Sequence, residues 1–377
     1  MKRQIARITT HTEWMSIRVV ASHLEAPSRL LSSDNASGTH PLVMEALQRA
    51  NAGHALAYGN DRFTHDAEAA FSELFGKDVV TRFVFGGTGA NVMALANMLQ
   101  PAEAVVCTSW SHIAVDEAGA PERFLGAKLI DIPSVDAKLR PSDLQSLSHL
   151  FGSEHHVQPR VVSITQATEL GTLYTAKEVK DLCTSAHEMN LLVHMDGARI
   201  CNATAALGAS REALRSFTID AGVDVLTFGG TKTGVMFGEA VIFFNTALAA
   251  RSLYIRKQST QLYSKMRFIS VQYSALLKDD LFIDLGVASN GAAQSLFDQV
   301  RGVESLQLST PPLVNSIYPV LDPEVGKALQ DWSFFWDWDA ATHQVRWMTA
   351  WDVDHSDIDR FVAGLKSLLG YKSHRFN

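Results

Sequence analysis

The residue with the strongest chemical signal in this sequence is Lys232, which lies in the segment Phe228–Gly234 (Phe-Gly-Gly-Thr-Lys-Thr-Gly). This segment follows an apolar run, and the glycines on both sides of the lysine allow a sharp turn that leaves space around the amine. A lysine removed from water has a lowered pKa and can form a Schiff base as a nucleophile. A surface lysine in a strand-turn-strand would have the same local sequence, so this segment alone leaves both interpretations open.

An acidic residue upstream favours the nucleophile. The apolar segment Leu191–Met195 runs into Asp196, and Arg199 follows three residues later. An aspartate at the carboxyl end of a buried parallel strand is costly unless it meets a cation. Pyridoxal phosphate (PLP) enzymes place an acid beside the pyridinium nitrogen and a lysine at the aldehyde. Asp196 followed by Lys232 after a later strand is typical of such a site, whereas a helix N-cap would explain only Asp196.

A third segment, Phe83–Asn91 (Phe-Val-Phe-Gly-Gly-Thr-Gly-Ala-Asn), is typical of a strand, a glycine turn and the start of a helix. Free backbone N–H groups and the helix dipole make such a turn an anion site, and Thr88 adds a hydroxyl. The dinucleotide fingerprint fits poorly because Val92 stands where a third small residue belongs, and no Walker-type Gly-Lys-Ser/Thr follows. The segment therefore predicts a phosphate site, with a tight turn that binds nothing as the alternative.

These segments require a scaffold that brings strand ends together. From Val79 to about Asn245, short apolar strands alternate with helical stretches such as Ala176–Asn190. This alternation predicts an α/β fold with a mainly parallel sheet covered by helices on both faces, in which ligands bind at the carboxyl ends of the strands. The expected strands are Arg82–Phe85, Ala104–Cys107, Ala127–Ile130, Val161–Thr165, Leu191–Met195, Val223–Phe228 and Ala240–Phe244.

The rest of the chain predicts a smaller C-terminal α/β domain. Its expected elements are helices at about 251–278 and 281–303, strands at 315–320 and 344–351, and a helix at 356–369. Trp332, Trp336 and Trp338 are expected to pack in the core of this domain. The predicted organisation is an N-terminal extension (1–31), a large domain (32–250), and linking helices with the small domain (251–377).

The composition excludes several functional classes. The chain has 377 residues, a net charge of −7 and an isoelectric point near 6.0, which does not suit nucleic-acid binding. Its three cysteines have neither disulfide nor metal-ligand spacing, and no apolar run is long enough to span a membrane. We expect a cytoplasmic protein. The basic residues 1–31 are also compatible with an organellar transit peptide, although a tail or packing arm suits their weak amphipathic pattern better.

In combination, these motifs resemble the threonine aldolase family of the beta-eliminating lyases, which are PLP enzymes of fold type I. The resemblance extends from about Ser33 to Asp352 and includes a form of the lysine motif, Phe-Gly-Gly-Thr-Lys, similar to the low-specificity bacterial branch. Its motifs, specific through their order, are Ser33-Asp34-Asn35, Ala57-Tyr58-Gly59-Asn60-Asp61, Gly86-Gly87-Thr88-Gly89-Ala90-Asn91, His112 with Glu117-Ala118-Gly119, His194-Met195-Asp196-Gly197-Ala198-Arg199 and Phe228-Gly229-Gly230-Thr231-Lys232. The resemblance implies a seven-stranded sheet and a homodimer or homotetramer with shared active sites.

The resemblance also implies roles for residues at the cofactor. Lys232 would form the Schiff base, Asp196 would pair with the pyridine nitrogen, and His112 would stack over the ring or act in proton transfer. The residues implied in phosphate binding and further cofactor contacts are Gly87, Thr88, Gly89, Arg199 and Thr231. The basic residues placed near the phosphate, or alternatively on a solvated face, are Lys257, Lys265 and Arg267.

For the substrate, the resemblance implies carboxylate binding by Ser33, Arg199 and Arg346. An arginine suits this role because its planar fork meets a carboxylate bidentately, although Arg346 would also fit an exposed strand position. His155 resembles a histidine that contacts the substrate hydroxyl, with the adjacent His156 as an alternative. Tyr58 resembles a tyrosine contributed across a subunit interface.

The activity implied is PLP-dependent retro-aldol cleavage of L-threonine, L-allo-threonine or related β-hydroxy amino acids to glycine and an aldehyde. Family members often carry a Glu-Asn-Thr segment where this chain has Thr165–Glu169, with the Gln-Ala-Thr form of the low-specificity branch. The contacts to the hydroxyl and the identity of the base therefore stay open. Because fold alone does not determine chemistry, β-elimination, transamination and a non-catalytic PLP-binding scaffold are alternatives. The broken dinucleotide fingerprint disfavours a nicotinamide dehydrogenase.

Overall fold

The computed structural model describes residues 23–308 and 310–375. The described chain forms two compact units. The large unit consists of residues Gly38–Gly286, and the small unit contains the described residues up to Ser37 and from Val287 onward. The boundary lies inside helix α13 (Leu281–Val300) rather than at residue 250, where the sequence had placed it.

The large unit is built on a seven-stranded sheet with the order β1-β7-β6-β5-β4-β2-β3. Only β7 is antiparallel to its neighbours β1 and β6, and the other adjacent pairs are parallel. This confirms the expected mainly parallel sheet. The strands are β1 (Val80–Val84), β2 (Glu103–Thr108), β3 (Lys128–Ile132), β4 (Gln158–Thr165), β5 (Leu192–Gly197), β6 (Val225–Gly229) and β7 (Glu239–Phe243).

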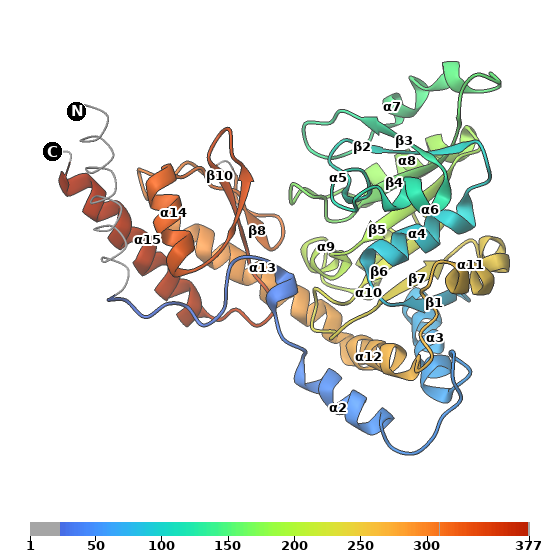
Figure 1. The fold of residues 1–377 in the computed structure, drawn as a ribbon, viewed down its shortest axis with the longest axis horizontal. Coiled ribbons are helices and arrows are strands. Elements are labelled where there is room, and N and C mark those ends of the chain that lie inside the picture. The colour runs from blue at the N-terminus through green and yellow to red at the C-terminus, as the bar shows by residue number, and fades with distance from the viewer. Residues whose placement is uncertain (1–22, 309, 376–377) are drawn as a thin grey trace, which may run out of the picture. The chain divides into compact units, whose positions relative to one another are not determined.

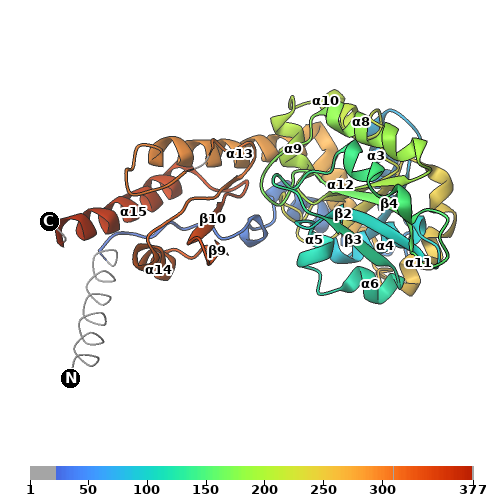
Figure 2. The same cartoon turned by 90° about the horizontal axis from the view of Figure 1, so that it is seen from above.

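Helices cover both faces of this sheet, as Figures 1 and 2 show. Helix α4 packs along β4, β5, β6 and β7 together with α6 and α11, while α8 lies on the other side of the sheet. All residues of β6 and β7 are buried, as expected for strands covered on both faces. The helices are α2 (Pro41–Ala50), α3 (Arg62–Phe75), α4 (Gly87–Met98), α5 (His112–Val115), α6 (Ala120–Leu125), α7 (Pro141–Gln145), α8 (Ala176–Glu188), α9 (Ile200–Ala206), α10 (Arg211–Ser216), α11 (Ser252–Gln258) and α12 (Arg267–Leu277).

Local sequence explains where the helices begin and end. Thr175 and Glu178 form a reciprocal capping box at the start of α8. The helix expected over residues 251–278 is interrupted between α11 and α12, where Ser259 ends the first helix and Thr260 has a positive φ of 63°. Ser and Thr compete with helical hydrogen bonding through their side chains, which explains the break. The short 3-10 helices are η1 (Asp34–Ala36), η2 (Ser148–Leu150), η3 (Thr246–Arg251) and η4 (Lys278–Asp280).

The small unit contains a three-stranded antiparallel sheet with the order β8-β10-β9. Its core is centred on the fully buried Trp347 and Phe361. Of the three tryptophans expected there, Trp332 packs against the core, but Trp336 is 53% exposed. The elements are β8 (Ser316–Ile317), α14 (Pro323–Trp332), β9 (Trp336–Asp339), β10 (Gln344–Met348) and α15 (His355–Arg375).

Part of the N-terminal extension belongs to the small unit. The backbone N–H groups of Ser28 and Arg29 donate to Asp357 at 2.8 and 3.2 Å, and Met348 N–H donates to Leu31 O at 2.9 Å. Residues 23–31 are therefore a packing arm. The expectation of a tail or transit peptide over the preceding residues, 1–22, falls outside the described part of the chain.

Candidate active site

The three chemically suggestive segments meet at one edge of the large sheet. Asp196 is the next-to-last residue of β5, the lysine turn (residues 229–234) begins at the end of β6, and the glycine turn (residues 86–90) follows β1. Since β1, β5 and β6 run in the same direction, their carboxyl ends lie at the same edge. This is the edge at which open α/β sheets bind ligands.

Asp196 is held as a buried carboxylate, with 4% of its surface exposed. Its Oδ2 accepts a hydrogen bond from Asn91 Nδ2 at 2.8 Å, and its Oδ1 accepts one from the Ala198 backbone N–H at 2.9 Å. The residue before helix α9 is Arg199, so Asp196 is not the N-cap of that helix. A buried carboxylate oriented by two amide donors suits a cationic ring nitrogen.

Asn91 also connects Asp196 to His112. Its Nδ2 lies 2.9 Å from Oε1 of the buried Glu117, and His112 Nδ1 lies 3.0 Å from the same oxygen. The hydrogen bond to Glu117 raises the pKa of His112, and the charge of Asp196 adds to this effect. The other side of His112 is held through its backbone N–H, which donates to Glu169 Oε1 at 2.9 Å. His112 is thus fixed by two acids while its side chain stays partly accessible.

The lysine turn is tightly packed around its glycines. A Cβ added at Gly229 would lie 2.6 Å from the Ala198 carbonyl oxygen, and one at Gly230 would lie 2.6 Å from the Tyr273 hydroxyl. The Gly230 N–H donates to Glu239 Oε2 at 2.7 Å in a buried environment. Lys232 itself is half-buried within this turn. The glycines are therefore required by close packing at the base of the lysine.

The glycine turn is open at its first two glycines by comparison. A Cβ added at Gly86 or Gly87 would meet nothing within 4 Å. Helix α4 begins there with no side-chain hydrogen bond at its N-cap, so its first N–H groups face this space. The side chain of Gln261 lies against Gly89 and accepts a hydrogen bond from Phe85 N–H at 3.0 Å. An uncapped helix start with open space in front of it fits a phosphate group, so the glycine turn and Asp196 together fit PLP.

Comparisons with known proteins agree with this geometry. The family model of the beta-eliminating lyases matches residues 31–315. The chain belongs to the beta-eliminating lyase family. It is similar to a low specificity L-threonine aldolase from a Pseudomonas species, with 37% identity over 91% of this chain and 98% of the relative. The resemblance to threonine aldolases is thereby confirmed, and with it the assignment as a lyase.

Solved structures give the same result for the fold. A threonine aldolase from Leishmania major superposes with a TM-score of 0.83 at 32% identity, covering 90% of this chain and 99% of that one. An aspartate aminotransferase from Rhodobacter sphaeroides has a TM-score of 0.65 at 17% identity, covering 93% of this chain and 95% of that one. The second likeness concerns the fold alone, and the expected fold type I is confirmed.

Within this family fold, the structure places the other predicted residues as follows. Arg199 comes directly before α9 and three residues after Asp196, at the same sheet edge. Thr231 lies in the lysine turn, where its hydroxyl is 3.4 Å from Gly238 O. Tyr58 lies in the loop between α2 and α3, and its ring faces the Lys257 ammonium at 5.7 Å.

Ser33 and Arg346 lie in the small unit, where they come close together. Arg346 Nη2 donates to Ser32 O at 3.3 Å, and its guanidinium lies 5.6 Å from the ring centroid of Trp338. Ser33 caps η1, with its hydroxyl accepting from Asn35 N–H at 3.2 Å. The structure therefore brings Arg346 to the backbone of the residue next to Ser33, and the carboxylate-binding role of both residues stays a prediction.

His155 is not brought to the site edge. It precedes β4, its side chain is 83% exposed, and its nearest acidic group is Glu154 at 3.9 Å. The following Gln158 N–H donates to Ala102 O just before β2, which places this loop at the amino ends of the parallel strands. β4 has eight residues, so at about 3.3 Å per residue the opposite edge is roughly 25 Å away. The prediction that His155 contacts the substrate hydroxyl therefore lacks support within this chain.

Several site residues were not assigned a role from the sequence. Asn91 and Glu117 belonged to recognised motifs, but only the fold shows that they connect Asp196 with His112. Glu169 is half-buried just after the carboxyl end of β4, where the Thr165 hydroxyl donates to it at 2.8 Å, and desolvation raises its pKa. Gln261, next to the glycine turn, and Glu239, next to the lysine turn, are two further site residues of this kind. No local pattern distinguishes such residues, because each is defined by contacts with a distant segment.

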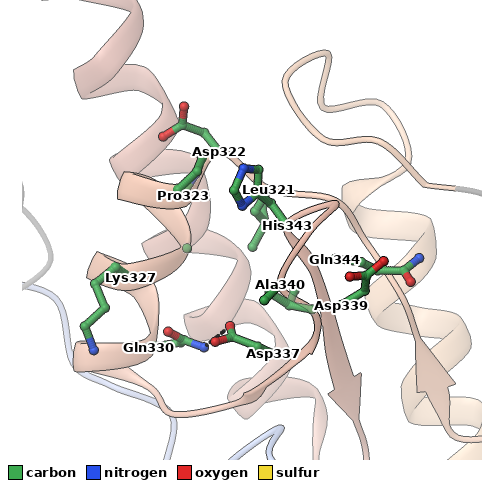
Figure 3. Close-up of a pocket in the computed structure, with 12 residues that line it drawn as sticks. Leu321, Asp322, Pro323, Lys327, Gln330, Asp337, Asp339, Ala340, His343 and Gln344 are labelled. Atoms are coloured by element: carbon green, nitrogen blue, oxygen red, sulfur yellow. Dashed lines mark hydrogen bonds between the residues drawn. The ribbon is translucent and has the colours of Figure 1, made fainter.

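Two surface pockets lie elsewhere. One of about 330 Å³ in the large unit is lined by Gly53–Ala57 together with Ser264, Lys265 and Arg267. The other, of about 180 Å³, lies between α14 and the β9–β10 hairpin of the small unit, where Gln330 donates to Asp337 at 2.8 Å (Figure 3). Asp339 in that pocket accepts from Ala341 N–H and the Thr342 hydroxyl, so its acids are engaged locally.

In the part of the chain that the structure describes, no helix has the length and apolar character needed to cross a bilayer.

Proposed function

We propose that this chain is a PLP-dependent aldolase that cleaves L-threonine, L-allo-threonine and related β-hydroxy amino acids to glycine and an aldehyde. The observation that carries the proposal is the convergence of Asp196, the lysine turn and the open glycine turn at one sheet edge. It occurs in a chain that matches a low specificity L-threonine aldolase along almost the whole length of both proteins.

The geometry of the large unit supports the cofactor contacts that the family resemblance implies, and we propose them for this chain. Asp196 would hold a proton on the ring nitrogen, and Lys232 would supply the amine for the aldehyde. Gly87, Thr88 and Gly89 would bind the phosphate through the uncapped start of α4, with Thr231 and Arg199 as further contacts. When bound, PLP accepts the electron pair that is released when the Cα–Cβ bond breaks.

His112 is the proposed group for stacking and proton transfer. Its Nδ1 is engaged with Glu117, which leaves Nε2 available to exchange a proton with the substrate hydroxyl directly or through water. Because the Glu117 contact raises the pKa of His112, this imidazole is suited to accept a proton. For the substrate carboxylate we propose Arg199. Ser33 and Arg346 remain candidates from the resemblance.

We further propose that the chain works as a homodimer or homotetramer, in the cytoplasm. The large unit carries an aromatic patch formed by the exposed Phe85 and Tyr263 and by the half-buried Phe237 between them, with successive ring centroids 5.6 and 6.4 Å apart. Exposed apolar patches of this kind are typical of protein interfaces. Tyr58 is exposed as well, as expected for a residue that would act in a neighbouring subunit. Sedimentation of the wild type and of Phe85→Glu tests this, because a monomeric wild type would contradict it.

The direct test of the activity is aldehyde release from L-threonine and L-allo-threonine by the wild type and Lys232→Ala. We expect release by the wild type and a loss of at least about a thousandfold in the variant, since no other group can replace the amine. Circular dichroism serves as the control for folding. Equal release by both proteins would disprove the role of Lys232, and the ratio of the two substrates gives the stereochemical preference.

Assays of other substrates and products separate the alternatives. Pyruvate and ammonia from serine would indicate β-elimination, and transfer of the amino group to a keto acid would indicate transamination. PLP binding without any of these products would indicate a non-catalytic scaffold. These alternatives share the fold type, since the aspartate aminotransferase from Rhodobacter sphaeroides superposes on this chain.

A further inference from the structure

The antiparallel strand β7 has a position that no other strand of the large sheet has. It lies between β1, which leads into the glycine turn, and β6, which leads into the lysine turn. Its first residue, Glu239, pairs in register with Val84 at the end of β1 and with Gly229 at the end of β6. The carboxyl group of Glu239 therefore lies at the sheet edge from which both the glycine turn and the lysine turn begin.

The contacts of Glu239 are directed at the lysine turn. Its Oε2 accepts the Gly230 N–H at 2.7 Å in a buried environment. The Tyr273 hydroxyl donates to Gly238 O at 2.9 Å and to Phe228 O at 3.2 Å. A carboxylate and a phenol therefore both hold the backbone at the base of the lysine turn.

The carboxyl group is buried and electrostatically coupled to the lysine. Glu239 is 7% exposed, and burial raises its pKa to about 7 against the opposing effects of the Gly230 amide, the Thr231 hydroxyl and the Lys232 charge. Coupling between two charges is mutual, so an ionised Glu239 favours the charged form of the Lys232 amine. The other titratable groups around the turn are Asp196 from β5, His112 from α5, Cys201 from α9 and Tyr273 from α12.

We propose that Glu239 is a positioning residue for Lys232: its carboxylate fixes the lysine turn through Gly230 and stabilises the positive charge on the lysine nitrogen. This inference rests on the proposed role of Lys232 in holding the cofactor. Glu239 would act through the lysine without touching the substrate.

The experiment compares the full-length wild type with Glu239→Gln and Glu239→Asp. Gln keeps the shape and the acceptor oxygen but removes the charge, whereas Asp keeps the charge on a shorter side chain. An amine-reactive reagent is applied at a series of pH values to each full-length protein after PLP has been removed, so that the Lys232 amine is not in a Schiff base. Labelling of the Lys232 peptide is measured by mass spectrometry. Glu68→Gln, which removes a half-buried acid paired with Arg82 in the same unit, is the matched control.

We expect the pH midpoint of Lys232 labelling to fall by about one unit in Glu239→Gln, the size expected for the loss of one nearby charge. The midpoint should stay close to that of the wild type in Glu239→Asp and in Glu68→Gln. Identical midpoints in the wild type and Glu239→Gln would overturn the proposal. An equal shift in Glu239→Asp would also overturn it, because charge would then not be the cause.

A second measurement keeps this inference separate from the proposed function. The visible absorbance of each PLP-treated protein is titrated with pH in the absence of substrate. A wild type with no lysine-linked absorbance band would disprove the cofactor role of Lys232, and the labelling experiment would still report on Glu239. A band that titrates at the same pH in the wild type and Glu239→Gln would disprove the role of Glu239 alone.

Discussion

The glycine turn and the lysine turn have similar sequences but use their glycines for opposite purposes. A Cβ at Gly86 or Gly87 would enter open space, whereas a Cβ at Gly229 or Gly230 would lie within 2.6 Å of another atom. In the first turn the missing side chain leaves room for a ligand at the start of α4. In the second it allows two chain segments to approach each other beneath Lys232. The role of the glycines in a turn after a strand can therefore be assigned only when the tertiary contacts of that turn are known.

The comparison is tested most strongly by Gly229→Ala. The new methyl group would overlap with the backbone of Ala198, which cannot move away as a flexible side chain could. Overpacking of this kind costs about 1–3 kcal/mol, so we expect a thermal unfolding midpoint several degrees below that of the wild type. Differential scanning calorimetry measures this. A midpoint equal to that of the wild type would mean that the lysine turn is not tightly packed.

The matched change in the other turn is Gly87→Ala. Because its Cβ would meet no protein atom, we expect the free energy of unfolding to stay within about 0.5 kcal/mol of the wild type. The methyl group would instead occupy the proposed phosphate space, and the loss of one charge-assisted hydrogen bond corresponds to about tenfold weaker PLP binding. Fluorescence titration of the cofactor-free protein with PLP measures the affinity. Unchanged affinity with unchanged stability would exclude this turn as the phosphate site.

The fold could be predicted from these segments to a large extent, because apolar runs and turn glycines are local signals. The expected strands overlap all seven strands of the large sheet. The small unit was harder to predict. Its strand β9 contains the exposed Trp336 and the polar Asp337 and Asp339, so no apolar alternation marks it. The joining of residues 23–37 to the C-terminal part likewise depends on long-range pairing, such as that of Leu31 with Met348.

A smaller effect, on the pH profile of kcat/KM, is expected for a change at Glu117. Helix α4 starts at the glycine turn and carries Asn91, which links Asp196 to Glu117 and so to His112. Glu117→Gln removes the charge that contributes to the raised pKa of His112, so that pKa should fall. If neutral His112 accepts a proton, activity is lost as the pH falls through this pKa. The acidic limb of the pH profile of kcat/KM should therefore move to lower pH in the variant.

The profile is measured for threonine cleavage between about pH 5 and 9, a range that brackets the ordinary pKa of histidine. Glu122→Gln changes an exposed acid of the nearby helix α6 and serves as the control, with an expected profile like that of the wild type. An acidic limb that stays in place in Glu117→Gln, or moves to higher pH, would show that His112 does not control it.

The site residues could be predicted from the sequence when they lie at the carboxyl end of a strand. The prediction for His155 took no account of its place before a strand. Asp196 lies at the carboxyl end of its strand, Arg199 and Lys232 follow theirs, and the parallel sheet brings all three to one edge. His155 precedes its strand, so the same rule places it at the opposite edge. Its assignment rests on the resemblance, with the adjacent His156 as an alternative.

The smallest effect is therefore expected at His155. Since both turns and Asp196 lie at the carboxyl edge, a side chain 83% exposed at the amino edge should contribute nothing to the chemistry within its own chain. We expect His155→Ala to retain kcat/KM for L-threonine within about twofold of the wild type, while His112→Ala loses most of it. The two variants remove the same side chain from opposite ends of the strands, so the pair isolates the effect of position. A large loss in His155→Ala would require the loop before β4 to reach a site in a neighbouring subunit.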